Sequence, residues 1–124
     1  MAFTTLPHDH GNVARVGQLK EILDRAEKFS AAAAAMSLLA DPSRLRIFWL
    51  LCHCEECVLN ISAISGMSSP AVSHHLRLLK EAGLLSSRRD GKEVYYTAAD
   101  TPLCRELHCA AERLLELEGC PMPK

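Results

Sequence analysis

The sequence predicts a mainly α-helical, dimeric winged helix-turn-helix domain with one small β-hairpin. Apolar residues recur at helical spacing along most of its 124 residues, which is typical of amphipathic helices. Near Gly66, two such helices are separated by a short turn. Two short β-prone runs follow, joined by Asp90-Gly91, a dipeptide that strongly favours a hairpin turn. This order of elements is that of a helix-turn-helix followed by a wing.

Length, composition and charge narrow the classes of protein. A chain of 124 residues suffices for one domain, and 48% hydrophobic with 23% charged residues is an ordinary globular balance. No stretch has the length and apolarity of a transmembrane helix, and the N-terminus does not resemble a secretory signal. We therefore expect a cytoplasmic protein without a membrane partner. The net charge is only −1, but residues 71–92 contain five Lys and Arg against two acids. Such a local basic surface attracts DNA phosphates.

We divide the chain into three parts. Residues 1–12 are polar and contain Pro7 and Gly11, so they are predicted to form a flexible N-terminal arm. Residues 13–119 are the winged helix-turn-helix domain, with dimerisation helices at both ends. Residues 120–124 are a short C-terminal tail. The apolar stripe of the last helix consists of Leu103, Leu107, Ala110, Leu114 and Leu117.

The N-terminal part of the domain is predicted to be helical. Apolar spacing predicts a first helix over residues 13–29, and the alanine run favours a short second helix over residues 31–39. Asp41 as the N-cap and Pro42 at the first position begin a third helix, over residues 43–51. Its inward-facing residues are expected to be Leu45, Phe48, Trp49 and Leu51.

Capping residues and breakers place the later elements. The predicted order is a short strand at 58–59, a helix at 61–65 closed by Gly66, a helix at 71–82 closed by Gly83, hairpin strands at 84–87 and 94–97, and a last helix from Pro102 to Gly119. The expected N-caps of the three helices are Asn60, Ser68 or Ser69, and Asp100 or Thr101.

The second helix of the pair is predicted to read DNA. A short helix braces it, and its exposed face can enter the major groove, where side-chain donors reach base edges and phosphates. The hairpin tip is basic and suits the backbone or the minor groove. The residues predicted to contact DNA are Ser69, Ser73, His74, His75, Arg77 and Lys80 on the helix, and Arg88, Arg89 and Lys92 on the wing. The alternative is a helical bundle whose basic face is merely solvated.

The cysteines indicate a metal site. Six cysteines without an export signal more often bind metal or sense redox chemistry than form disulfides. Cys54 and Cys57 form a C-x-x-C motif, whose thiolates can both reach one ion. The remaining ligands must come from elsewhere, and the candidates are His8, His10 and Cys120. Soft thiolates favour zinc, cadmium, lead or Cu(I), and trivalent arsenic if three sulfurs converge, while participation of histidine favours zinc and cadmium among these.

Other cysteines have simpler explanations. Cys52 continues the apolar face of the third helix and is expected in the core, since free cysteine packs as a small hydrophobe. Cys104 and His108 lie four residues apart on the last helix and could share an ion, although interface packing is the commoner role of such a pair.

Several segments resemble the ArsR/SmtB metalloregulators. Residues 40–47 (ADPSRLRI) resemble the opening of a helix in that family, residues 73–80 and 82–84 its recognition helix, and residues 89–96 (RDGKEVYY) its wing. The resemblance spans residues 30–101. It implies a homodimer that represses metal-resistance or metal-export genes and releases DNA on binding metal. Two recognition helices about one DNA turn apart match an inverted-repeat operator.

The resemblance is incomplete at both metal sites of the family. Related sensors carry a C-x-C near the third helix, helped by N-terminal ligands. Here Cys57 lies near the first cysteine of that pattern and Leu59 at the second. A second family site on the last helix would use Asp100 and Glu116, but Pro102 and Arg113 occupy its histidine positions, so we predict that this site is lost.

Two other functions are alternatives to a metal-responsive repressor. The first is a thiol-based redox or persulfide-responsive repressor on the same scaffold, with a disulfide between Cys57 and either Cys104 or Cys109. The second is an enzyme. Residues 53–55 contain the H-x-E of zinc deaminases, but the P-C-x-x-C that must follow is missing, and so are the nucleophile elbow and phosphate loop of other enzymes. We therefore predict that the protein is not an enzyme.

Overall fold

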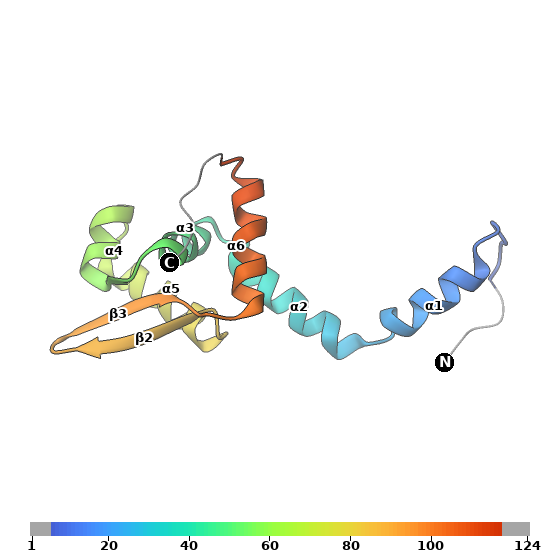
Figure 1. The fold of residues 1–124 in the computed structure, drawn as a ribbon, viewed down its shortest axis with the longest axis horizontal. Helices are drawn as coiled ribbons and strands as arrows, with labels where there is room; N and C mark the ends of the chain where they lie inside the picture. The colour runs from blue at the N-terminus through green and yellow to red at the C-terminus, as the bar shows by residue number, and fades with distance from the viewer. Residues whose placement is uncertain (1–5, 118–124) are drawn as a thin grey trace. The chain divides into compact units, whose positions relative to one another are not determined.

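The computed structural model describes residues 6–117 (Figure 1). The chain forms two compact units, residues 1–36 and residues 37–124, which are described separately. Among the described residues, none of the helices combines the length and apolarity that crossing a membrane requires.

The first unit contains helix α1 (Val13–Leu23) and most of helix α2 (Ala26–Leu39). The prediction of one helix reaching Phe29 is wrong, because α1 ends earlier and Phe29 belongs to α2, which begins at Ala26 rather than at residue 31. Around Arg25 the backbone hydrogen bonds span two or three residues instead of four, and this interrupts the helix. Neither helix contains a buried residue. Residues 6–12 form no helix or strand.

The second unit combines helices with a small antiparallel sheet around one core. Its helices are α3 (Pro42–His53), α4 (Val58–Ser65), α5 (Ser69–Glu81) and α6 (Pro102–Leu114). Its strands are β1 (Glu56–Cys57), β2 (Leu85–Asp90) and β3 (Glu93–Ala98), in the order β1-β3-β2. Figure 1 shows the β2–β3 hairpin extending beyond the helices, with its turn at the far end. This is the predicted helix-turn-helix and wing.

One continuous apolar core holds these elements together. Its most deeply buried side chains are Ile47, Phe48 and Leu51 of α3, Ile61 of α4, Val72, Leu76 and Leu79 of α5, and Leu84. Two of the residues expected to face inward from α3, Leu45 and Trp49, are only half-buried, and Ile47 lies in the core instead. Helix α3 also continues past residue 51 as far as His53.

The predicted caps of α3, α5 and α6 are confirmed. Asp41, Ser68 and Thr101 each accept a hydrogen bond from the backbone amide three residues further on, at the starts of α3, α5 and α6. Gly66 ends α4 with φ 76°, a left-handed conformation that favours glycine. Gly91 has φ 64° in the hairpin turn.

The segment between α3 and α4 differs from the prediction. The strand lies at Glu56–Cys57 rather than at residues 58–59, because these two residues pair with Tyr95 and Tyr96 of β3. Helix α4 therefore begins at Val58, and Asn60 is not its N-cap. The Asn60 amide instead donates to Glu56 Oε1 at 2.8 Å.

The last helix is shorter than predicted. Helix α6 ends at Leu114, and Glu116 follows with φ 57°, while the expected end at Gly119 lies outside the described residues. Its buried face consists of Cys104, His108 and Ala111. Of the predicted stripe, Leu107 is half-buried and packs against the core, whereas Leu103, Leu114 and Leu117 are 48%, 82% and 44% exposed.

Candidate nucleic-acid interface and metal site

Helix α5 presents a polar face opposite its buried side. Val72, Leu76 and Leu79 face the core, so their spacing leaves the intervening positions outward. Of the residues predicted to contact DNA, Ser73, His74, Arg77 and Lys80 are exposed, whereas Ser69 and His75 are half-buried. The exposed group lies on one helix whose N-terminus is capped by Ser68. This arrangement suits a helix that enters a groove of DNA.

His75 lies in a different environment from its neighbours. Burial lowers the pKa of its imidazole below the usual value, and Arg44 and His74 lower it further, against the opposing charge of Asp41. Its Nδ1 is buried without a hydrogen-bond partner among the described residues. A contact between His75 and DNA therefore stays a prediction, since the structure gives this side chain a packing position.

The two exposed cations of α5, Arg77 and Lys80, each have a polar partner. Arg77 lies 3.1 Å from His74 Nδ1 and 3.8 Å from Glu81. Lys80 donates to Ser87 Oγ of β2 at 2.6 Å and so links the two predicted DNA-contacting elements. These contacts orient the side chains without covering them, because all of them remain at the surface.

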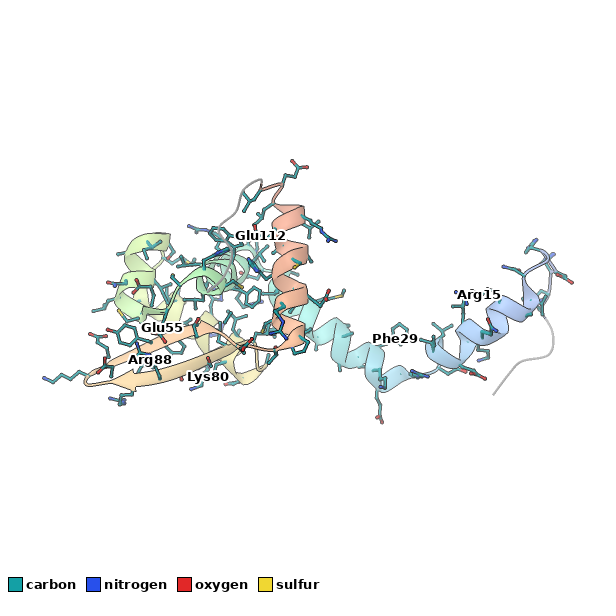
Figure 2. The ribbon with its side chains drawn as sticks, viewed as in Figure 1. Arg15, Phe29, Glu55, Lys80, Arg88 and Glu112 are labelled. Carbon is teal, nitrogen blue, oxygen red and sulfur yellow. The ribbon has the colours of Figure 1, made fainter. Side chains whose placement is uncertain are left out.

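Arg88 of the wing forms a two-pronged ion pair with Glu55. Its Nε and a terminal nitrogen approach the two carboxylate oxygens at 2.8 and 2.6 Å, and its guanidinium lies 4.7 Å from the centre of the Tyr95 ring. The bond from Arg88 lowers the pKa of the Glu55 carboxyl, and the same bond raises the pKa of the guanidinium. Figure 2 shows these two residues beside each other at the hairpin.

Glu55 was not predicted, because it lies 33 residues from Arg88 and no local pattern joins them. The other two wing cations are exposed, and within residues 6–117 neither Arg89 nor Lys92 forms an ion pair. The wing therefore presents two uncommitted cations and one that is paired with a carboxylate.

The C-x-x-C motif lies where α3 meets β1. Cys54 ends α3 and is exposed, and its Sγ lies 3.5 Å from the Leu50 carbonyl oxygen. Desolvation, followed by the charge of Glu56, raises the pKa of its thiol. Cys57 is buried and pairs with Tyr95 in the sheet. Two thiolates suit a soft ion, but among the described residues neither cysteine belongs to a group of three or more ligating side chains.

Two of the other predicted ligands belong to the first unit. His8 and His10 are exposed in the first unit, with their rings stacked at a centroid distance of 6.0 Å. Cys120 lies outside the described residues. The ligand set of Cys54, Cys57, His8, His10 and Cys120 therefore remains a prediction.

Another group of ligating side chains was missed by sequence reasoning. His53 of α3 and His108 and Glu112 of α6 place one ligand atom each within 4.8 Å of the others. Of this group, only the spacing of four residues between His108 and Glu112 is visible in the sequence. His108 was considered with Cys104, but its ring contacts His53 and Glu112.

The remaining described cysteines are Cys52 of α3 and Cys104 and Cys109 of α6. Cys52 and Cys104 are buried as part of the core, as expected for Cys52, and burial together with the charges of Cys104 and Glu112 raises the pKa of Cys52 to about 12. Both line a cavity of about 530 Å³ that Cys109 also lines, whereas Cys57 does not. All five described cysteines are free thiols.

The sequence is similar to those of known bacterial transcriptional regulators. The bacterial regulatory proteins of the arsR family match residues 41–87. A transcriptional repressor SmtB homologue from Synechocystis is 40% identical over 94 residues, covering 76% of this chain and 69% of the relative. The cadmium resistance regulatory protein CadC of Listeria innocua is 45% identical over 60 residues, covering 48% of this chain and 50% of that protein. This chain thus spans half the length of CadC.

Solved structures have the same architecture. One is the homodimeric winged helix-turn-helix DNA-binding domain Mb0332 of Mycobacterium bovis, with a TM-score of 0.66 at 31% sequence identity. The match covers 75% of this chain and 86% of the Mb0332 chain. Reduced HlyU from Vibrio cholerae has a TM-score of 0.66 at 25% identity, covering 77% and 96%. With its capped α5, its basic wing and a 40% identical repressor as a relative, this chain belongs to the ArsR/SmtB family of DNA-binding transcriptional regulators, which are not enzymes.

Proposed function

We propose that the chain is a homodimeric repressor that binds an inverted-repeat operator and releases it when Cys54 and Cys57 bind a thiophilic metal ion. The observation that carries this proposal is the direct physical link between the cysteine turn and the wing. Glu55 lies between the two cysteines and pairs with Arg88, and Cys57 itself is hydrogen-bonded into the sheet opposite Tyr95.

The operator contacts follow from exposure and charge. Ser73, His74, Arg77 and Lys80 would face the major groove from α5, and the wing cations Arg88, Arg89 and Lys92 would face phosphates or the minor groove. Phosphate contacts carry much of the affinity of such proteins, so binding should weaken steeply with salt.

The dimer follows from apolar surface that a single chain leaves open. Helices α1 and α2 bury none of their residues, although Leu19, Ile22, Leu23 and Phe29 are 44–67% exposed. Leu103 and Leu114 of α6 are also exposed. Patches of this kind commonly mark protein–protein interfaces, and the similar Mb0332 domain is a homodimer. Two copies would present two α5 helices to the two halves of an inverted repeat.

The metal site requires ligands beyond the motif. Cys54 and Cys57 would supply two thiolates, and His8, His10 or Cys120 the others. Zinc, cadmium and lead suit such a mixed set, and trivalent arsenic suits three sulfurs. SmtB and the cadmium resistance regulator CadC, both similar in sequence, support a metal as the signal.

Metal binding at the two cysteines could affect the wing directly, because Glu55, which lies between them, contacts Arg88. Cys54 and Cys57 flank Glu55, so any change in the turn that accompanies ligation also shifts the carboxylate that holds Arg88. Allosteric coupling free energies are typically about 1–3 kcal/mol, and we expect metal to change operator affinity by an amount of this order.

The test replaces both cysteines. The full-length Cys54→Ser/Cys57→Ser variant should bind operator DNA as tightly as the unmodified chain and should not release it with zinc or cadmium. Fluorescence anisotropy with a labelled promoter fragment, under anaerobic conditions, measures the operator affinity and the release of DNA by metal. The matched control is Cys109→Ser, another exposed cysteine, which should still respond to metal. Metal-induced release by the double variant would place the sensing site elsewhere.

A thiol sensor is the second candidate. The cavity lined by Cys52, Cys104 and Cys109 favours it, because an exposed thiol there adjoins two buried ones. Cys109 would attack a sulfane sulfur of a polysulfide and form a persulfide, while the shortened polysulfide leaves. In this case polysulfide should release the operator in the presence of a chelator, and Cys109→Ser should abolish that release. Retention of DNA under polysulfide would eliminate this candidate.

A further inference from the structure

The contact between α3 and α6 contains a compact cluster of nitrogen and oxygen ligands. His53 Nε2 lies 3.0 Å from His108 Nε2 and 3.1 Å from Glu112 Oε1, and His108 Nε2 lies 2.6 Å from the same oxygen. The side chains are only 12%, 10% and 18% exposed, respectively. Figure 2 shows Glu112 on α6.

The three ligand atoms lie mutually close, within hydrogen-bonding range, and their spacing is also near that of ligands around a metal ion. Ligand atoms around a tetrahedral zinc ion lie about 3.3 Å apart, because each bond is about 2.0–2.1 Å long. The three edges here are 3.0, 3.1 and 2.6 Å, so two edges would lengthen by about 0.2–0.3 Å and the third by about 0.7 Å around such an ion. A neutral imidazole nitrogen and a carboxylate oxygen can each donate a lone pair to a metal.

We propose that His53, His108 and Glu112 form a second metal site, internal to one protomer, for a divalent ion of the zinc class. Two imidazoles and one carboxylate are a borderline ligand set that zinc accepts and that soft ions such as lead or arsenic do not prefer. Three protein ligands leave one position of a tetrahedral ion open to water or another small ligand. This site shares no ligand with the predicted Cys54/Cys57 site.

Surrounding side chains orient the ligands. Trp49 Nε1 donates to Glu112 Oε1 at 3.2 Å, and the Trp49 and His53 rings lie 4.7 Å apart. The His53 and His108 rings meet edge to face, also at 4.7 Å. Outer hydrogen bonds of this kind fix the direction of a ligating carboxylate and are typical of built metal sites. An ion bound here would tie α6 to α3.

The experiment uses the full-length Cys54→Ser/Cys57→Ser chain, from which the thiolate pair is absent. Freed of metal with chelator and titrated with Co²⁺, it should bind one equivalent per protomer. The visible bands of tetrahedral cobalt should appear without a sulfur-to-cobalt charge-transfer band, and Zn²⁺ should remove the colour. Adding Glu112→Gln, which keeps the shape of the side chain, should weaken Co²⁺ binding at least about tenfold.

Controls separate ligation from general effects. Glu106→Gln removes the same charge from an exposed position of α6 and should leave Co²⁺ binding unchanged. His53→Gln, on the other helix, should weaken binding as Glu112→Gln does, and circular dichroism verifies that each variant is folded. Absence of Co²⁺ binding by the double-serine chain, or equal binding by the Glu112→Gln and Glu106→Gln variants, would overturn the proposal. Because operator release is not measured, this result is independent of the proposed sensing function.

Discussion

At the residue scale, the ion pair between Glu55 and Arg88 decides how much charge the wing offers to DNA. The pair is two-pronged and lies at the surface, where a phosphate can compete with the carboxylate. The lowered pKa of Glu55 keeps its carboxylate charged at neutral pH. The pair is therefore fully present above the usual glutamate range and is lost as the pH falls through the lowered pKa.

Removing the Glu55 charge should strengthen DNA binding. In Glu55→Gln, Arg88 no longer has to leave a carboxylate to reach a phosphate, so we expect operator affinity to rise about two- to fivefold. Anisotropy titrations at several salt concentrations measure the change. The control Glu106→Gln removes an equal charge far along the chain, on α6, and an equal gain there would show that net charge alone is responsible.

At the element scale, the turn between α4 and α5 depends on Gly66. This residue has φ 76° and ends α4, and nothing lies within 4 Å of the position that a β-carbon would occupy. A substitution there is opposed by backbone conformation and not by crowding. The left-handed region costs most side chains about 1–2 kcal/mol, whereas asparagine tolerates it.

Gly66→Ala should consequently lower the free energy of unfolding by about 1 kcal/mol, and Gly66→Asn should lower it by clearly less. Urea denaturation of both variants, followed by circular dichroism, measures the difference. Equal losses in the two variants would indicate a steric cause instead of a conformational one.

Three helix caps that depend on neighbouring residues were predictable from sequence, whereas strand β1 and the His53 cluster, which depend on distant residues, were not. Caps at Asp41, Ser68 and Thr101 follow from side chains that bond to amides three residues away. Strand β1 exists only because residues 95 and 96 pair with it, so no local pattern could place it. For the same reason the sequence could suggest the cysteine turn but could not bring His53 to α6.

At the scale of the whole molecule, the exposed leucines of α6 are one part of the proposed dimer surface, beside the apolar residues of α1 and α2. Leu103 is the second residue of α6, where an aspartate is compatible with the helix because the N-terminus carries partial positive charge. A loss of dimer in Leu103→Asp would thus reflect the interface and not a broken helix.

We expect Leu103→Asp to raise the dimer dissociation constant at least about tenfold, since a charge would be buried in an apolar interface. Analytical ultracentrifugation should then detect the 13.6 kDa monomer at concentrations where the unmodified chain is dimeric. Leu59→Asp, also at the second position of a helix and 66% exposed, is the matched control and should remain dimeric. A dimer in both variants would assign the interface to other elements.

Within the described part of the chain, the strand order β1-β3-β2 leaves one side of β2 without a neighbouring strand. Arg88 and Arg89 lie on this open edge, and charged side chains on an edge strand oppose the pairing of one molecule with the next. Replacing both by alanine would therefore promote self-association as well as weaken the grip on phosphates. Replacing both arginines by lysine keeps the positive charge that opposes self-association. The lysine variant therefore tests whether DNA binding needs the guanidinium groups themselves, without the complication of aggregation.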